Sequence, residues 1–127
     1  MAIDQINIST PSTLISFTDT VLGNAVDGVK ASSAKLYSVI VDNSANGGAA
    51  SYVKIFNATT GSITLGVTAP DIIIYVPGGA ILTTAFFTGA TQGVTLGTAL
   101  SAACVTTGGT AGTTSPVSSV AVTINYV

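Results

Sequence analysis

The sequence predicts an all-β protein built as an antiparallel β-sandwich, of jelly-roll or immunoglobulin-like type, with an extended N-terminal arm. β-Branched residues and glycine dominate the chain, whereas Leu and Lys are scarce and Glu and Arg are absent, so the strongest helix formers are few. Several short segments alternate apolar and polar side chains, and turn-forming residues separate them. Strands at intervals of about 8 to 15 residues, joined by such turns, are typical of an antiparallel sandwich.

Alternation with period two is clearest in three segments, which are KLYSVIV (35–41), SYVKIFN (51–57) and SVAVTINYV (119–127). In the first, Tyr37, Val39 and Val41 share one predicted face and Leu36 lies on the other. A strand that is buried on one side has this pattern. Three further segments alternate less regularly but are also predicted strands: DIIIYV (71–76), AILTTAFF (80–87) and TALSAACVTT (98–107).

The segments between the strands carry turn-forming residues. The stretch DNSANGGAA (42–50) joins two of the clearest strands, and it predicts a β-hairpin in which Asn46-Gly47 adopts positive φ. The stretches TAPD (68–71) and VPGG (76–79) bracket the isoleucine-rich strand, and TGGTAGTTSP (107–116) links the last two strands.

Residues 1–30 differ from the remainder, and we divide the chain into this N-terminal segment and a sandwich domain of residues 31–127. The segment is interrupted by Pro11, Gly23 and Gly28, and the two glycines argue against a helix over residues 19–29. Two interpretations remain open, an arm that reaches a neighbouring subunit or the capsid lattice, and an edge strand of the chain's own domain. The expected apolar anchors of an arm are Ile6, Ile8, Leu14, Ile15 and Phe17.

The composition argues against an enzyme. The chain has no His, Glu, Arg or Trp, its acidic groups are five aspartates, and no residue after Asp71 is charged. A nucleophilic hydroxyl needs a base to take its proton, and no acid–base pair is recognisable. We therefore expect no catalytic residues, no cofactor and no metal site. The single cysteine, Cys104, is predicted to be a small buried apolar residue.

Charge and hydropathy also restrict the partners. Three lysines and a net charge of −2 provide no basic patch for nucleic acid or for an anionic membrane surface. The longest apolar run, IIIYV (72–76), is far shorter than the roughly 20 residues of a membrane-spanning helix. Charged residues are 6% of the chain, against about 25% in ordinary soluble domains, so we expect much of the surface to be covered by other protein.

Three stretches resemble small virion proteins of tailed phages, and they are KLYSVIVDNSANGGAASYVKIFNA (35–58), TLGVTAPDIIIYVPGGA (64–80) and ALSAACVTTGGTAGTTSPVSSVAVTINY (99–126). Their order is a Leu-Tyr strand, an Asp-Asn loop, a Tyr-Val-Lys-Ile strand, a Thr-Ala-Pro-Asp turn, and a Thr/Gly-rich loop before a final Val-rich strand. The resemblance implies an oligomeric β-sandwich that serves as a structural protein, such as a capsid cement (decoration) protein.

A cement protein would bind the major capsid protein or another virion protein and would also bind itself. The resemblance implies a homotrimer, because cement proteins commonly occupy local threefold positions. The expected location is the virion, after assembly in the cytoplasm of a bacterial host. A tail or fibre subunit is the alternative within this class, and a carbohydrate-binding adhesin is a more distant one, because flat sugar platforms favour Trp, which is absent.

Overall fold

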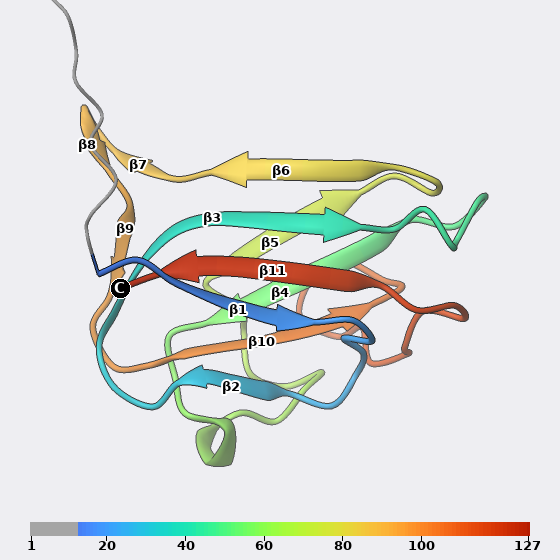
Figure 1. Ribbon diagram of the computed structural model, residues 1–127. Coiled ribbons are helices and arrows are strands. Elements are labelled where there is room, and N and C mark those ends of the chain that lie inside the picture. Colours follow the sequence, from blue (N-terminus) through green and yellow to red (C-terminus); the bar gives the residue numbers. More distant parts are fainter. Residues whose placement is uncertain (1–12) are drawn as a thin grey trace, which may run out of the picture.

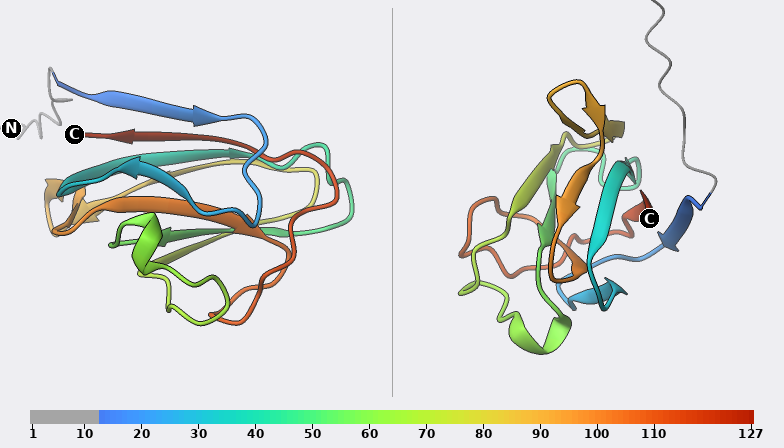
Figure 2. Two further views of the ribbon diagram at one scale, coloured as in Figure 1. Left: turned by 90° about the horizontal axis from the view of Figure 1, so that it is seen from below. Right: turned by 90° about the vertical axis from the view of Figure 1, so that its left-hand side faces the viewer.

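Two antiparallel sheets pack face to face in the computed structural model, which describes residues 13–127 (Figures 1 and 2). Sheet A has the order β1 (Ile15–Asp19), β11 (Ala121–Tyr126), β3 (Ala34–Asp42) and β6 (Ile81–Ala85), and β9 (Val94–Leu96) also pairs with β3. Sheet B has the order β2 (Asp27–Lys30), β10 (Leu100–Val105), β4 (Ser51–Phe56) and β5 (Ile72–Val76). The predicted all-β sandwich is confirmed.

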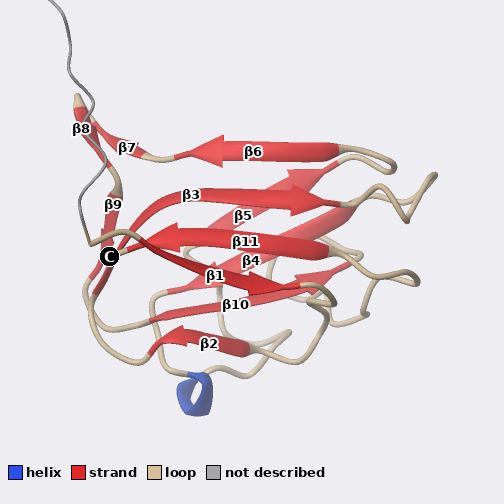
Figure 3. Cartoon of the chain, viewed as in Figure 1, coloured by secondary structure: helices blue, strands red, loops and turns tan. Residues whose placement is uncertain are grey.

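Two small elements complete the described chain. A two-stranded hairpin of β7 (Phe87–Thr88) and β8 (Thr91–Gln92) lies beyond the end of β6, between β6 and β9 (Figure 1). A single 3₁₀ turn, η1 (Thr60–Ser62), follows β4 and is the helical element coloured in Figure 3. No helix within residues 13–127 has the length and apolar character needed to cross a membrane.

The core between the sheets consists of alternate residues of the central strands. Val122 and Ile124 of β11 contribute from sheet A, and Val53 and Ile55 of β4 contribute from sheet B, each with no exposed surface. The side chains of β10 are buried on both faces of sheet B. A strand covered on both sides loses its alternation, which is why 98–107 showed no clear period in the sequence.

The predicted hairpin of residues 35–41 and 51–57 is wrong. These segments form β3 and β4, which lie in different sheets, so residues 43–50 cross from one layer to the other. Positive φ is absent from Gly47 and occurs instead at glycines such as Gly79 in the VPGG turn. The crossing is stabilised by buried amides: Asn43 Nδ2 donates to the carbonyls of Ala49 (3.0 Å) and Pro77 (3.1 Å).

A β-bulge at Tyr37 corrects the predicted faces of β3. The partner of Asn125 is Ser38, but the partner of Tyr126 is Leu36, so Tyr37 is the extra residue. The bulge moves Leu36 to the inner face, where it is fully buried in the core. The sequence pattern had placed Leu36 opposite the core-facing valines, because strict period two assumes an unbroken ladder.

The N-terminal segment supplies one edge strand to each sheet over its described part. β1 pairs with β11 and β2 pairs with β10, and residues 19–29 contain no helix. The edge-strand interpretation therefore holds for residues 15–30. Residues 1–12, which include the predicted anchors Ile6 and Ile8, lie outside the described residues.

Candidate interaction surfaces

The outer face of sheet A is an uncharged surface four strands wide. Strand register aligns its side chains in two transverse rows, Ser16–Asn125–Ser38–Ala85 and Thr18–Thr123–Ile40–Thr83. We call these eight residues the sheet A face. None of them is charged, and Asp42 pairs with Ile81 in the next row, at the end of the sheet.

Polar side chains of the sheet A face hydrogen-bond one another across the strands. Ser16 Oγ donates to Asn125 Oδ1, and Asn125 Nδ2 donates to Ser38 Oγ at 2.9 Å. The hydroxyls of Thr18 and Thr123 are 3.5 Å apart in the next row. Groups that are already paired within a face lose fewer water contacts when another protein covers it, so their burial costs less.

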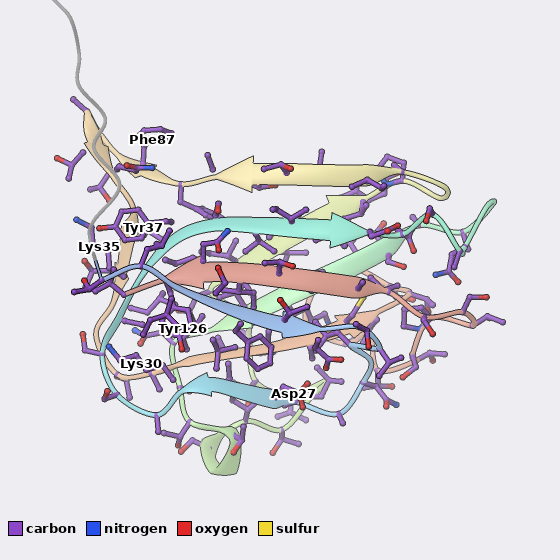
Figure 4. All side chains as sticks on the ribbon, in the orientation of Figure 1. Asp27, Lys30, Lys35, Tyr37, Phe87 and Tyr126 are labelled. Carbon is purple, nitrogen blue, oxygen red and sulfur yellow. The ribbon has the colours of Figure 1, made fainter. Side chains whose placement is uncertain are left out.

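The chain covers the core to different degrees at the two sides of the sandwich where the edge strands of the two sheets meet. On the β1–β2 side, residues 20–26 cross between the sheets, with Leu22 buried and its N–H donating to Val120 O at 3.0 Å. The hydroxyl of Tyr126 also reaches across this side to donate to Val29 O at 3.3 Å (Figure 4 labels Tyr126). The core is therefore covered there by the chain itself.

On the β5–β6 side, called the open side below, the chain crosses between the sheets at the turn 77–80. Ile72, Leu82 and Phe86 pack against the core from this side but stay only half-buried. Neither β5 nor β6 contains a charged residue or a proline. Natural sheets use charges and prolines to block unwanted strand pairing, so β6 is an unprotected edge.

The hydrogen-bond phase of β6 shows which backbone groups face outward. The N–H of Phe86 donates to Tyr37 O, and the N–H of Asn43 donates to Ala80 O, in the same antiparallel register. Residues 80, 82, 84 and 86 therefore bond to β3, because bonded and non-bonded pairs alternate. The N–H and C=O groups of Ile81, Thr83 and Ala85 point away from the sheet.

Tyr52 and Tyr75 form an aromatic pair on the outer face of sheet B. Their ring centroids are 5.4 Å apart and their planes are tilted by 54°, so they do not make a flat platform. Gly108 packs on one of the two rings, since a Cβ at Gly108 would lie 2.8 Å from Tyr52 Cε1. Tyr75 is 54% exposed, and Ile73 beside it on β5 is also exposed.

The loop of residues 106–119 covers part of sheet B and contacts a buried lysine. Lys54 has no exposed surface, and its Nζ donates to the carbonyls of Thr110 (3.2 Å) and Gly112 (2.9 Å). Burial lowers the pKa of this amine, because the charged form has lost its water. Lys54 thus serves as a structural anchor for the loop rather than as a free surface charge.

A carboxyl pair joins the ends of the two N-terminal strands. Asp27 begins β2 (Figure 4) and Asp19 ends β1. A hydrogen bond with Asp19, followed by burial and by the negative charge of Asp19, raises the pKa of Asp27 to about 6. Asp19 also accepts the N–H of Val21 at 2.8 Å. Residues 20–26, which cross between the sheets, connect the two aspartates. Residues 13–127 contain no group of three or more His, Cys, Asp or Glu side chains that could hold a metal.

Shallow hollows on the described surface include the following two. One, of about 210 Å³, is formed by residues 21–23 and 115–119 and is lined by no charged side chain. The other, of about 120 Å³, lies between β2 and the turn before η1, and Lys30 is its one charged lining residue. Neither brings an acid and a base together.

The predicted anchor residues within the described chain have distinct environments. Ile15 is 49% exposed and pairs with Tyr126, whereas Phe17 is half-buried against the core and pairs with Ile124. Leu14 is half-buried just before β1. The sequence did not indicate the β7–β8 hairpin, on which Phe87 is 49% exposed (Figure 4), because two-residue strands are too short for periodicity.

Comparisons of this chain with protein-family models, with characterised proteins and with solved structures give no match.

Proposed function

We propose that this chain is a non-enzymatic structural protein of a tailed-phage virion, namely a capsid cement protein that binds the major capsid protein and itself. The proposal follows the sequence resemblance described above. The sheet A face supports it most, because this surface carries no charged side chain and its polar side chains hydrogen-bond one another. Protein–protein interface cores are depleted of charged residues in the same way.

A homotrimer is the proposed assembled state, and assembly into the virion is proposed to occur in the cytoplasm of the host bacterium. The exposed apolar side chains on β5 and on the β7–β8 hairpin support self-association, because their burial removes apolar surface from water. Sedimentation at micromolar concentration tests this state.

The decisive experiment adds the purified protein to shells assembled from the major capsid protein encoded by the same phage genome. We expect co-sedimentation with the shells at a fixed stoichiometry. Thr123→Lys places a charge at the centre of the sheet A face and should abolish binding. Thr107→Lys is the matched control, since this exposed threonine lies in the loop over sheet B. Equal binding by both variants would show that the sheet A face is not the contact.

A tail or fibre subunit is the alternative within the same class. Labelling intact particles with an antibody against the protein separates the alternatives, because label on the shell supports cement and label on the tail contradicts it. A carbohydrate-binding adhesin has weaker support, because the tilted Tyr52–Tyr75 pair offers no flat surface for a sugar ring.

A further inference from the structure

We propose that residues 5–9 of one copy add to the free edge of β6 in a second copy as an antiparallel strand. This inference concerns contacts between copies of the chain and does not depend on the capsid as a partner. It rests on the open side of the sandwich, on the backbone of β6 and on the side-chain pattern of residues 5–9.

The side-chain pattern of QINIS (5–9) matches both surfaces that an added strand would extend. Ile6 and Ile8 alternate with Gln5, Asn7 and Ser9. The apolar pair would continue the core on the open side. The polar residues would continue the sheet A face, whose rows consist mainly of Ser, Thr and Asn side chains.

The apolar side chains of the added strand would contact half-buried apolar side chains of the acceptor copy. Leu82 on β6 is half-buried, as are Ile72 and Phe86 at the same side of the core. Two isoleucines placed beside Leu82 would cover side chains that now stay half-exposed. The five residues of the segment equal the five residues of β6 in length.

The edge of β6 presents backbone groups that can hydrogen-bond to an added strand. The N–H and C=O groups of Ile81, Thr83 and Ala85 point away from β3, as deduced from the bonds of Phe86 and Asn43. The side chains of these three residues lie on the outer side of the sheet. In an antiparallel pair, the side chains of two directly opposite residues lie on the same face of the sheet. The donor residues opposite Ile81, Thr83 and Ala85 must therefore have side chains on the outer face, and these are the polar residues Gln5, Asn7 and Ser9.

The segment cannot make this pairing with its own β6. Three antiparallel steps across sheet A make β1 and β6 antiparallel, and they occupy opposite edges. A segment antiparallel to β6 therefore runs parallel to β1. Its last residue, Ser9, would lie level with Asp19 at the end of β1, whereas the chain must continue to Ile15 at the start of β1. The return to Ile15 would cross about 19 Å of sheet and about 14 Å along it, or about 24 Å in all. The six residue steps from Ser9 to Ile15 span about 22 Å at most, which is still short of this distance.

A donor and an acceptor on every copy give a head-to-tail contact, which closes into a ring when the rotation between copies allows it. Three copies related in this way form the proposed trimer. Each copy would then have its open side covered by its neighbour.

Two full-length variants test the contact from both partners. Ile6→Asp/Ile8→Asp removes the donor, and Thr83→Pro removes an outward N–H of the acceptor without breaking a bond to β3. We expect each variant alone to sediment as a monomer, with the dissociation constant of the contact raised about 10³-fold. An equimolar mixture should form a 1:1 heterodimer, because one variant keeps the acceptor and the other keeps the donor.

Retention of the wild-type oligomer by either variant would overturn the proposal, as would a mixture that stays monomeric or a wild-type protein that is monomeric. Circular dichroism and denaturant unfolding verify that Thr83→Pro is folded. If it is not, cross-linking supplies the test with Asn7→Cys paired in turn with Ile81→Cys, Thr83→Cys and Ala85→Cys. At least one pair should form an intermolecular disulfide, whereas Asn7→Cys with Ser16→Cys on β1 should not. A disulfide at Ser16 alone, or at no position, contradicts the proposal.

Discussion

The side chain of Lys54 crosses from β4 to the loop that covers sheet B, where its Nζ donates to the carbonyl of Gly112 at 2.9 Å. A second bond, to the carbonyl of Thr110 at 3.2 Å, fixes the same loop. The lysine is fully buried, so these bonds replace the water that the ammonium has lost. The Thr/Gly-rich loop is thus tied to the sandwich through backbone carbonyls.

Replacement of this lysine should loosen the loop without unfolding the sandwich. Met fills a similar volume in Lys54→Met but leaves two carbonyls without their donor. We expect the free energy of local opening of residues 106–119 to fall by about 2 kcal/mol, and elastase to cleave this loop about 30-fold faster. Lys30→Met on β2 is the control, because Lys30 lines the hollow beside η1 rather than the loop of residues 106–119. Equal cleavage of wild type and Lys54→Met would contradict the anchoring role.

The crossing between β3 and β4 should depend on Asn46 and not on the adjacent glycine. Asn46 is 6% exposed; its Nδ2 donates to Asn43 Oδ1 (2.9 Å) and Ser118 O (3.1 Å), and its Oδ1 accepts from Ser118 N (2.9 Å). Asn46→Ala should lower the free energy of unfolding by about 2–4 kcal/mol, because buried groups lose their partners. Gly47 has negative or extended φ and an added Cβ would contact nothing within 4 Å.

Gly47→Ala is therefore the matched control for Asn46→Ala, and we expect it to change the unfolding free energy by no more than about 0.5 kcal/mol. Urea titration followed by circular dichroism measures both variants. A larger loss for the glycine variant than for the asparagine variant would restore the hairpin-turn interpretation, in which backbone conformation rather than the amide side chain matters.

The sequence predicted most strands but not which strands pair. Alternation located the segments that became β3, β4 and β11, and the turn at VPGG was recognisable from Pro77 and Gly79. The pairing of β3 with β4 was wrongly predicted because adjacency in the chain favours a hairpin, whereas buried amides at Asn43 and Asn46 stabilise a crossing between layers. Those amides looked like ordinary turn residues, since their burial depends on the distant carbonyls of Pro77 and Ser118.

The candidate surfaces were still less accessible to sequence reasoning. The low charge indicated that surfaces would be covered, but not that the sheet A face would align Ser16, Asn125 and Ser38 in one row. Register fixes that row, and register depends on the whole ladder. The burial of Lys54 could not be predicted from its strand, because the loop that buries it lies more than fifty residues further along the chain.

Cys104 should be unreactive in the native protein. Burial raises the pKa of its thiol to about 12, and a hydrogen bond with Ser51 opposes this shift only in part. At pH 8 the thiolate is then about 10⁻⁴ of the total, and the sulfur is also covered. We expect no fast reaction with an aromatic disulfide reagent until denaturant is added, and then one thiol per chain. Thr107→Cys, in the exposed part of the loop, should add one fast-reacting thiol; fast labelling of the native wild type would contradict the buried position.

The carboxyl pair of Asp19 and Asp27 should make the protein more stable in mild acid than at neutral pH. The pKa of Asp27 is raised from 3.8 to about 6 in the folded state, first by the hydrogen bond with Asp19. The folded state therefore binds a proton more tightly than the unfolded state, and the stabilisation is complete below pH 3.8 and lost as pH rises through about 6. We expect Tm to fall as pH increases from about 4 to about 7.

Two variants isolate this effect. Asp27→Asn donates to Asp19 at every pH, so its Tm should be nearly constant in this window and should exceed that of the wild type at neutral pH. Asp71→Asn, which lies before β5 at the opposite edge of sheet B, should keep the wild-type slope. Asp42 does not affect Tm in this pH window. Hydrogen bonds from the side chain of Ser44, and then from its backbone N–H, lower the pKa of Asp42. Its contribution to the stability of the fold is therefore lost only as pH falls below 3.8. A wild-type Tm that stays level or rises between about pH 4 and 7 would contradict the raised pKa of Asp27.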